Sequence, residues 1–350
     1  MRVGILTFHN TPNFGASLQC AALARYISHL GHDVEVINYA PLRTRHQYLK
    51  WMFTGQNASI RNVGRMWNLR QFRKQHYRLS GGPILSHAAL TRHCGARYDA
   101  LVIGSDEVWK ENGLRPFDTA FFGAFADPER TRIIAYAPSA SMDSALGRKV
   151  ETVTPLLNCM TAVSARDENT AEELRQHYGI KAPLVVDPTL LEPFTAETPF
   201  KAPYPRYLAV YAGSTQEQTA ALRRFADLND LKIVGIGYDE PGFDKCYLAL
   251  GPGEWLSLIR QSTAVFTHFY HGVIFALIYG KPLYAYVDGS KQHKVGSLMT
   301  QIGLQHLLHP TPNSIAEMRL NDLTYPASHL ARLDPLVARS RSYLEKALAP

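Results

Sequence analysis

One stretch in the second half of the chain, residues 262–294, predicts a strand, a turn, a helix and a second strand in succession. Residues 264–267 form a short apolar run, and residues 273–279 form a longer one that ends before Gly280. A short apolar run between turns is typical of a buried strand, whereas the longer run fits two turns of a helix. Residues 282–287 then predict the second strand. The chain must therefore contain an α/β unit here.

The turn inside this unit carries groups that suit an anion. We expect the helix to begin just after His271 and to direct its free N–H groups and positive dipole end at the turn. Lys291 and Lys294 follow the second strand and could reach the same place. A single His is more often a packing residue than a reactive one. From the residues alone, a packing role for His271 therefore stays open.

The start of the chain predicts a second such unit. Residues 3–8 indicate a strand, residues 17–30 a helix and residues 34–38 another strand, an order that is typical of a parallel sheet. The loop with Asn13 and Gly15 lies at the carboxyl end of the first strand, where open α/β sheets bind ligands. The alternative is a tight turn in which Asn and Gly supply unusual dihedral angles.

The length of 350 residues leaves room for two domains. Residues 193–204 contain three Pro and no helix or strand period, so we expect a linker there. An N-terminal α/β domain would span 1–192, with a basic helical insertion at about 41–98. A C-terminal α/β domain would span 205–350, with a last helix, about 330–347, that could pack back on the first domain.

Cysteine usage and hydropathy favour a soluble cytoplasmic protein. The four Cys are scattered without a C-x-x-C pair, which indicates reduced thiols and not a disulfide or zinc framework. No apolar run reaches the roughly 18 residues of a membrane span. The N-terminal apolar run has only six residues and lacks the cleavage site of a signal peptide.

The block 41–98 contains eleven Lys or Arg and not one Asp or Glu. Five apolar side chains of this block fall roughly on one helical face: Ile60, Val63, Met66, Trp67 and Phe72. Such a helix could lie on an anionic membrane surface through Arg65, Arg70 and Arg73. It could equally pack its apolar face on the core and leave its Arg residues solvated. Nucleic-acid binding has no supporting motif, and we expect no nucleic-acid partner.

Two further strand ends carry polar groups. Gly104, Ser105 and Asp106 follow the predicted strand 100–103 and could bind sugar hydroxyls, or could cap a helix. Arg166 stands between a predicted strand and a predicted helix, where its fork could pair with a phosphate or a carboxylate. The alternative for Arg166 is an ion pair with a nearby acid.

In their order along the chain, these motifs resemble the polysaccharide pyruvyl transferase family. The residues that carry the resemblance are Asn13-Phe14-Gly15-Ala16, Gly104-Ser105-Asp106, Ser164-Ala165-Arg166-Asp167, Tyr270-His271-Gly272, Gly280-Lys281-Pro282, Lys291 and Lys294. The resemblance implies two Rossmann-like domains with a cleft between them, an architecture like that of the B-type glycosyltransferases. It also implies transfer of the enolpyruvyl unit of phosphoenolpyruvate to two hydroxyls of one sugar, which gives a pyruvate ketal and phosphate.

The resemblance suggests roles for the candidate residues. Arg166 and one of Lys291 and Lys294 would bind the anionic groups of the donor from opposite domains, and His271 would be the general acid or base. The remaining predicted contacts to donor or acceptor are Asn13, Gly15, Ser105, Asp106, Tyr270 and Gly272. The acceptor would be a glycan. The basic, aromatic block 41–98 motivates the further hypothesis that the acceptor is a lipid-linked oligosaccharide, which the protein could reach through peripheral membrane contact of that block. We expect no metal and no cofactor.

The sequence departs from the family pattern at Phe269, where the family usually has Ser or Arg. Lys291, Lys294 or His268 could offset that loss, or the donor or acceptor could differ. Two other classes remain open: a nucleotide-sugar glycosyltransferase of the same architecture, and a glycan-binding protein without turnover.

Overall fold

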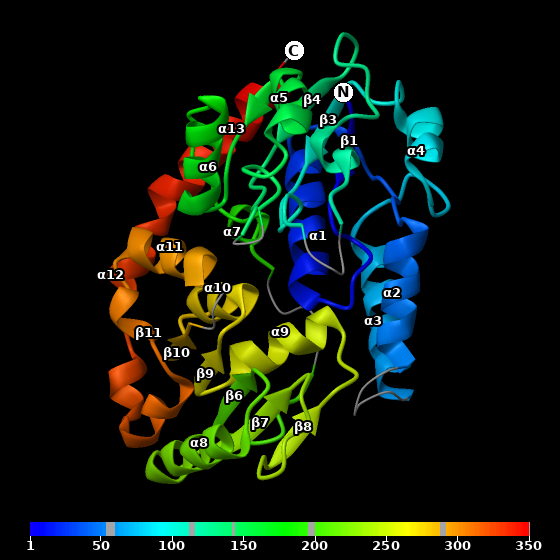
Figure 1. Ribbon diagram of the computed structural model, residues 1–350. Helices are drawn as coiled ribbons and strands as arrows, with labels where there is room; N and C mark the ends of the chain where they lie inside the picture. Colours follow the sequence, from blue (N-terminus) through cyan, green and yellow to red (C-terminus); the bar gives the residue numbers. More distant parts are fainter. Residues whose placement is uncertain (54–59, 112–115, 142–143, 195–199, 288–291, 350) are drawn as a thin grey trace. The chain divides into compact units, whose positions relative to one another are not determined.

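The computed structural model describes residues 1–53, 60–111, 116–141, 144–194, 200–287 and 292–349 (Figure 1). The chain divides into two compact units. The first comprises residues 1–58, 73–193 and 335–350, and the second comprises residues 59–72 and 194–334. Each unit is an α/β domain with its own parallel sheet, which confirms the predicted fold class.

The first unit begins with the predicted strand–helix–strand order. Its elements are β1 (Arg2–Leu6), α1 (Phe14–His29), β2 (Asp33–Val36), α2 (Leu42–Phe53), the end of α3 (Ile60–His76), α4 (His87–Cys94), β3 (Ala100–Ile103), η1 (Thr119–Phe122), β4 (Arg132–Ala135), α5 (Val150–Asn158), β5 (Ala162–Val163), α6 (Glu168–Tyr178), α7 (Pro188–Leu191) and most of α13 (Leu333–Leu348).

The five strands of the first sheet lie in the order β2-β1-β3-β4-β5, and every pair is parallel. The chain adds β2 on one side of β1 and then β3 on the other side. Leu6 pairs with Ile103, so the loops after β1 and β3 leave the same edge next to each other. This is the switch point at which open α/β sheets bind ligands.

The second unit repeats this plan. Its elements are the start of α3, β6 (Tyr207–Tyr211), α8 (Gln216–Leu228), β7 (Lys232–Ile236), β8 (Lys245–Tyr247), α9 (Pro252–Gln261), β9 (Ala264–Thr267), α10 (Tyr270–Ile278), β10 (Leu283–Tyr286), α11 (Gln292–Ile302), η3 (Gln305–Leu307), β11 (Leu308–His309), η4 (Pro312–Glu317), η5 (Leu320–Leu323), α12 (Ala327–Leu330) and the start of α13.

The second sheet has the order β11-β10-β9-β6-β7-β8, again parallel throughout. Its switch point lies between β6 and β9, where Tyr211 pairs with Thr267. The predicted strand 264–267 is confirmed as β9, and most of the apolar run after it lies in helix α10, which is buried except for Ile278 at its end. A helix that is apolar on all sides must be buried, so α10 is part of the core of this unit.

The basic block does not form the single membrane-facing helix that we considered. Its middle segment, 59–72, groups with the second unit, where Asn68 donates to the Ala249 carbonyl at 2.7 Å. On α3, Trp67 is 59% exposed but Phe72 is only 7% exposed, so the expected apolar face is divided between solvent and core. Arg73 is buried and donates to Asn10 and to the Thr11 carbonyl at 2.6 and 2.9 Å, so it cannot meet a membrane.

The C-terminal helix α13 holds its last residues on the first unit. Ser340 accepts from the Val186 N–H at 2.9 Å, and the Tyr343 hydroxyl donates to the Ala135 carbonyl at 2.9 Å. Among the described residues, no helix has both the length and the apolar character needed to cross a membrane.

Candidate functional site

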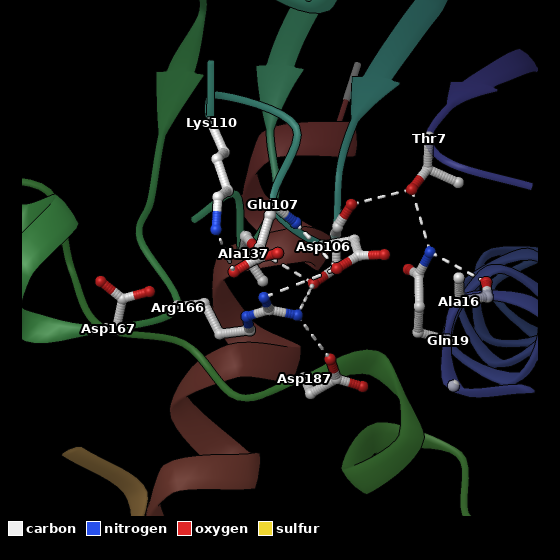
Figure 2. Close-up of polar contacts among 12 residues, drawn as sticks. Thr7, Ala16, Gln19, Asp106, Glu107, Lys110, Ala137, Arg166, Asp167 and Asp187 are labelled. Carbon is white, nitrogen blue, oxygen red and sulfur yellow. Dashed lines mark hydrogen bonds and ion pairs between the residues drawn. The ribbon is translucent and has the colours of Figure 1, made fainter. Parts of the chain in front are cut away.

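At the switch point of the first unit, a chain of hydrogen bonds joins the two loops to α1 (Figure 2). Thr7, directly after β1, donates its hydroxyl to the Ser105 carbonyl at 2.8 Å. The Gln19 amide donates to the Thr7 hydroxyl at 2.9 Å and to the Ala16 carbonyl at 3.1 Å. All three of these hydrogen bonds are buried, so the network fixes the loop that contains Ser105.

Asn13 and Gly15 form the start of α1. The Asn13 side chain accepts from the N–H groups of Gly15 and Ala16 at 2.8 and 3.4 Å, which makes it the N-cap of the helix. Such a cap contributes about 1 kcal/mol to stability. Gly15 lies within the first helical turn, so the alternative of a tight turn with unusual dihedral angles does not describe it.

The loop after β3 has a backbone that few residues tolerate. Gly104 has a φ of 106°, and a Cβ there would lie 2.3 Å from the Tyr136 carbonyl oxygen, so only glycine fits. Asp106 has a φ of 83°, which is uncommon for a residue other than glycine. Ser105 is fully buried and donates its hydroxyl to the Ala137 carbonyl at 2.9 Å. Ser105 therefore holds this loop, and the Asp106 carboxyl remains partly exposed.

Arg166 follows β5 and lies almost entirely out of solvent. Its Nη1 donates to Asp187 Oδ2 at 3.1 Å and to Ser105 Oγ at 3.5 Å, and its Nη2 lies 3.8 Å from Asp106 Oδ1. Figure 2 shows the guanidinium pointing toward these groups and Asp167 pointing away from it. The ion pair that we considered as the alternative for Arg166 is thus present, with Asp187 as its partner.

In the second unit, α10 begins two residues earlier than its expected start after His271. Tyr270 is its first residue, and Phe269 is the N-cap. The expectation that His271 precedes the helix was therefore wrong: His271 lies in the first turn. Thr267 explains the early start, because its hydroxyl accepts from the Phe269 N–H at 3.0 Å while donating to the Tyr211 carbonyl at 2.8 Å.

Gly272 allows this helix start to pack on the sheet. A Cβ at this position would lie 2.6 Å from Thr267 Oγ1 and 3.0 Å from Tyr211 Cδ1. Contacts that short are not found for real Cβ atoms, so any side chain would push the first turn of α10 away from β6 and β9. Gly272 thus sets the position of the neighbouring His271.

Three predicted residues come together at this helix start. The Tyr270 and His271 rings are 5.5 Å apart between centres, and both side chains are mostly buried. Lys294, from the first turn of α11, places Nζ 5.9 Å from the centre of the Tyr270 ring, within range of a cation–π interaction. Lys291 lies outside the described residues.

Phe269 belongs to an aromatic cluster at the same edge. Its ring centre lies 4.8 Å from that of Tyr211, 6.2 Å from that of Tyr238 and 4.2 Å from that of His268. His268 Nδ1 is hydrogen-bonded to the Tyr286 hydroxyl. His268 is therefore held by β10, and Phe269 fills the space between the ends of β6, β7 and β9.

Comparison with known proteins assigns the chain to a family. The family model for polysaccharide pyruvyl transferases matches residues 13–288. The chain belongs to the polysaccharide pyruvyl transferase family. No curated protein sequence gives a significant match. Family membership places this pyruvyl transferase relative among the transferases of polysaccharide biosynthesis.

Solved structures with the same fold are distant in sequence. A putative UDP-N-acetylglucosamine 2-epimerase from Listeria monocytogenes is 13% identical, with 100% of this chain and 91% of that chain covered and a TM-score of 0.52. UDP-GlcNAc 2-epimerase from Methanocaldococcus jannaschii is 11% identical over 97% of this chain and 100% of that one, with a TM-score of 0.53. An Arabidopsis thaliana protein in complex with UDP-L-rhamnose is 14% identical, with 97% and 94% covered and a TM-score of 0.52. These likenesses establish the glycosyltransferase-B-like fold of this family member.

Arg65 lies beside the aromatic cluster of the second unit, although the sequence suggested only a membrane contact for it. It comes from α3, and its Nη1 lies 3.7 Å from the place of a Cβ on Gly237, directly after β7. Burial lowers the pKa of Arg65, and the nearby Tyr211 and Tyr238 act in the opposite direction. An Arg side chain stays protonated in proteins, so a cation lies beside the two tyrosines that pack on Phe269.

The structure therefore assembles the predicted residues in two groups. Ser105, Asp106 and Arg166 meet in the first unit, with Asn13 and Gly15 at the nearby start of α1. Tyr270, His271, Gly272 and Lys294 meet in the second unit, joined by Arg65. The expected approach of Arg166 to His271 joins residues of different units and stays a prediction.

Proposed function

We propose that this protein transfers the enolpyruvyl group of phosphoenolpyruvate to two hydroxyls of one sugar of a glycan or lipid-linked glycan. The observation that carries the proposal is the start of α10, where His271, Tyr270 and Lys294 lie together at the switch point of a sheet in a member of the pyruvyl transferase family. That place in an open α/β sheet is where a small ligand binds.

The donor requires positive charge, because phosphoenolpyruvate carries both a phosphate and a carboxylate. Lys294 and the N-terminal end of α10 supply it on one side of Tyr270. We propose that Arg65 supplies it on the other side of the edge. Phe269 stands where the family usually has Ser or Arg, and Arg65 lies beside the tyrosines that contact Phe269. A guanidinium from α3 would then replace the cation missing at Phe269.

In the proposed reaction, His271 is the acid that protonates the methylene carbon of the donor. The adjacent carbon becomes an oxocarbenium-like electrophile, and a sugar hydroxyl attacks it. The bond between this carbon and the phosphate oxygen then breaks, and a second hydroxyl of the same sugar closes the ketal. Of the two hydroxyl protons, one replaces the proton given by His271 and the other leaves with phosphate. Imidazole suits both proton transfers near neutral pH.

For Arg166 we propose a positioning role. Its fork is directed at Asp187, Ser105 and Asp106, so it orients the loop after β3 from within the first unit. Asp106, the partly exposed member of this group, would then be the one that contacts the acceptor or donor.

The test is release of phosphate from phosphoenolpyruvate in the presence of galactosyl, mannosyl and N-acetylhexosaminyl acceptors. We expect release that depends on the acceptor and that His271→Gln abolishes. Release of nucleotide from a sugar nucleotide with the same acceptors, and no phosphate from phosphoenolpyruvate, would instead favour a glycosyltransferase. Saturable binding of phosphoenolpyruvate without any phosphate release would favour a glycan-binding protein.

A further inference from the structure

The first unit contains a cavity of about 130 Å³ at the carboxyl ends of β1 and β2. Its wall is largely aromatic, with Phe8, Tyr39, Trp109, Phe117 and Phe121. Phe8 and Phe121 meet edge to face, with ring centres 5.0 Å apart, and Tyr39 lies 6.2 Å from Phe121. Such a cavity has room for a group about the size of one six-membered ring.

One carboxylate is fixed in this aromatic wall. Asp118 accepts from the Tyr39 hydroxyl at 2.8 Å and from the Ala120 N–H at 2.9 Å, so its orientation is set by two donors. A pyranose has apolar C–H faces that pack on aromatic rings and hydroxyls that donate to a carboxylate. An apolar pocket with a few oriented polar groups is typical of a specific small-molecule site.

The rim of the cavity is cationic. Arg43 and Arg45, both exposed, line it from the first turn of α2, and Lys110 lines it from the loop after β3. Lys110 lies 3.9 Å from Glu107, so the excess positive charge among the described lining residues rests mainly on the two Arg side chains. His9 adds no positive charge near neutral pH, because burial lowers its pKa to about 4. Guanidinium groups bind phosphate oxygens in a two-point manner, so the rim suits a phosphate attached to the ring.

The helix that bears these Arg residues also has an exposed apolar stripe. Leu42, Leu49 and Phe53 are 61%, 43% and 69% exposed, and their spacing of seven and four residues puts them on one face of α2. Lys50 and the two Arg residues flank this face. Apolar side chains between basic ones are typical of a helix that lies in the surface of an anionic membrane.

We propose that this cavity binds the sugar ring of an acceptor that is attached to a lipid phosphate. Arg43 and Arg45 bind the phosphate. The apolar stripe of Leu42, Leu49 and Phe53 contacts the membrane that carries the lipid. The inference rests on the proposed function, because it assigns the acceptor of that reaction. In this proposal α2 contacts the membrane, and not the helix with Arg65, Arg70 and Arg73 that the sequence suggested.

The cavity is tested with soluble sugar phosphates. Isothermal titration calorimetry would measure binding of galactose 1-phosphate, mannose 1-phosphate and N-acetylglucosamine 1-phosphate. The corresponding free sugars and inorganic phosphate are titrated separately as controls. We expect one sugar phosphate to bind more tightly than either its free sugar or inorganic phosphate. Arg43→Gln with Arg45→Gln should weaken this binding about tenfold or more, which corresponds to about 1.4 kcal/mol or more. Arg92→Gln with Arg130→Gln, two exposed residues outside the cavity, is the matched control and should bind normally.

The aromatic wall needs a variant that preserves folding. Tyr39→Phe keeps the ring and removes only the hydroxyl that orients Asp118, so it should weaken binding of the sugar phosphate and leave inorganic phosphate unaffected. Absence of binding by all three sugar phosphates, or equal affinity in the wild type and the Arg43 and Arg45 variant, would overturn the assignment of the cavity.

The membrane part is tested by co-sedimentation with vesicles of phosphatidylglycerol and phosphatidylcholine. Leu49→Ser with Phe53→Ser should reduce the pelleted fraction and leave sugar phosphate binding intact. Val63→Ser with Trp67→Ser removes exposed apolar side chains from α3 and should pellet like the wild type. Equal pelleting of all three proteins would overturn the role of the stripe.

These binding assays contain no phosphoenolpyruvate, so their failure differs from failure of the proposed function. If sugar phosphates bind in the cavity but no acceptor promotes phosphate release from phosphoenolpyruvate, the proposed reaction is ruled out and the binding site is retained. Phosphate release with an acceptor KM that is the same in the wild type and the Arg43 and Arg45 variant would keep the reaction and remove the site.

Discussion

Arg166 Nη1 donates to Asp187 Oδ2 at 3.1 Å, although both side chains are almost completely buried. A buried cation is tolerated only when a matched anion and further hydrogen bonds compensate for lost hydration. Asp187 is itself held by the N–H and hydroxyl of Thr189, at 3.1 and 2.7 Å. The pair therefore fixes the guanidinium and, through it, the loop with Ser105 and Asp106.

Removing one member of this pair should cost more stability than removing both. Arg166→Gln leaves the Asp187 carboxylate buried without its cation, so we expect a loss of about 3–5 kcal/mol in the free energy of unfolding. Arg166→Gln with Asp187→Asn removes the charge imbalance and should recover a large part of that loss. Urea unfolding of Arg166→Gln, of Asp187→Asn and of the double variant measures the difference. A double variant as unstable as the sum of both single variants would show that the pair is not coupled.

A positive charge at position 269 should compensate for the loss of the positive charge of Arg65. Arg65→Gln should raise the KM for phosphoenolpyruvate about tenfold to a hundredfold, because a charged contact to the donor is worth about 1.5–3 kcal/mol. Adding Phe269→Arg, at the place where the family usually has Ser or Arg, should restore much of that loss. Arg70→Gln changes an exposed residue of the same helix and is the control. A KM for phosphoenolpyruvate that is identical in wild type and Arg65→Gln would remove Arg65 from the donor site.

Gly272→Ala should lower both the stability of the protein and its activity. The added Cβ would lie 2.6 Å from Thr267 Oγ1, so the first turn of α10 must shift, at a cost of about 1–3 kcal/mol. The activity should fall with it, because His271 moves too. Gly296→Ala is the matched control, since its Cβ would meet nothing closer than Leu308 at 3.9 Å and should stabilise α11 by up to about 1 kcal/mol. Thermal unfolding and phosphate release measure both variants, and normal activity of Gly272→Ala would refute the packing argument.

His9 should make the fold sensitive to mild acid. Burial lowers its pKa from 6.5 to about 4 in the folded chain, and the charge of Arg73 adds to the effect. The unfolded chain thus binds a proton between pH 6.5 and 4 that the folded chain does not, so stability falls as the pH drops through this range and is unaffected above it. The full loss is about 3 kcal/mol at 1.36 kcal/mol per pKa unit.

The comparison protein for this pH effect is His9→Gln, whose side chain cannot be protonated in this range. Carboxylates titrate in both proteins, so the difference between their unfolding free energies isolates His9. We expect the wild type to lose stability relative to His9→Gln between pH 6.5 and 4. A constant difference across that range would contradict the effect of burial on the pKa of His9.

Sequence reasoning recovered the elements whose signal is local. The apolar run 264–267 is β9, and the predicted strand 100–103 is β3. The start of α10 was displaced because the prediction treated His271 as part of the turn. The Thr267 hydroxyl accepts from the Phe269 N–H and closes the turn, so the helix begins two residues earlier than expected. A side-chain contact of that kind is not visible in a hydropathy pattern.

Long-range contacts explain what the sequence could not provide. Arg65 and Arg73 look alike in the basic block, yet one lies beside Tyr211 and Tyr238 and the other donates to Asn10. Nothing near either residue in the chain encodes its partner. The cavity beside α2 was missed for the same reason, since its aromatic residues come from four separate segments.

The most direct test of the proposed reaction uses phosphoenolpyruvate labelled with ¹³C at the carbon that bears the phosphate. After incubation with an accepted sugar, carbon NMR would locate the label, and a phosphate assay would count the phosphate released. The proposal predicts a labelled ketal carbon bonded to two sugar oxygens, one phosphate per ketal, and no ketal with His271→Gln. Label found only in phosphoenolpyruvate or free pyruvate, with an unmodified sugar, would contradict it.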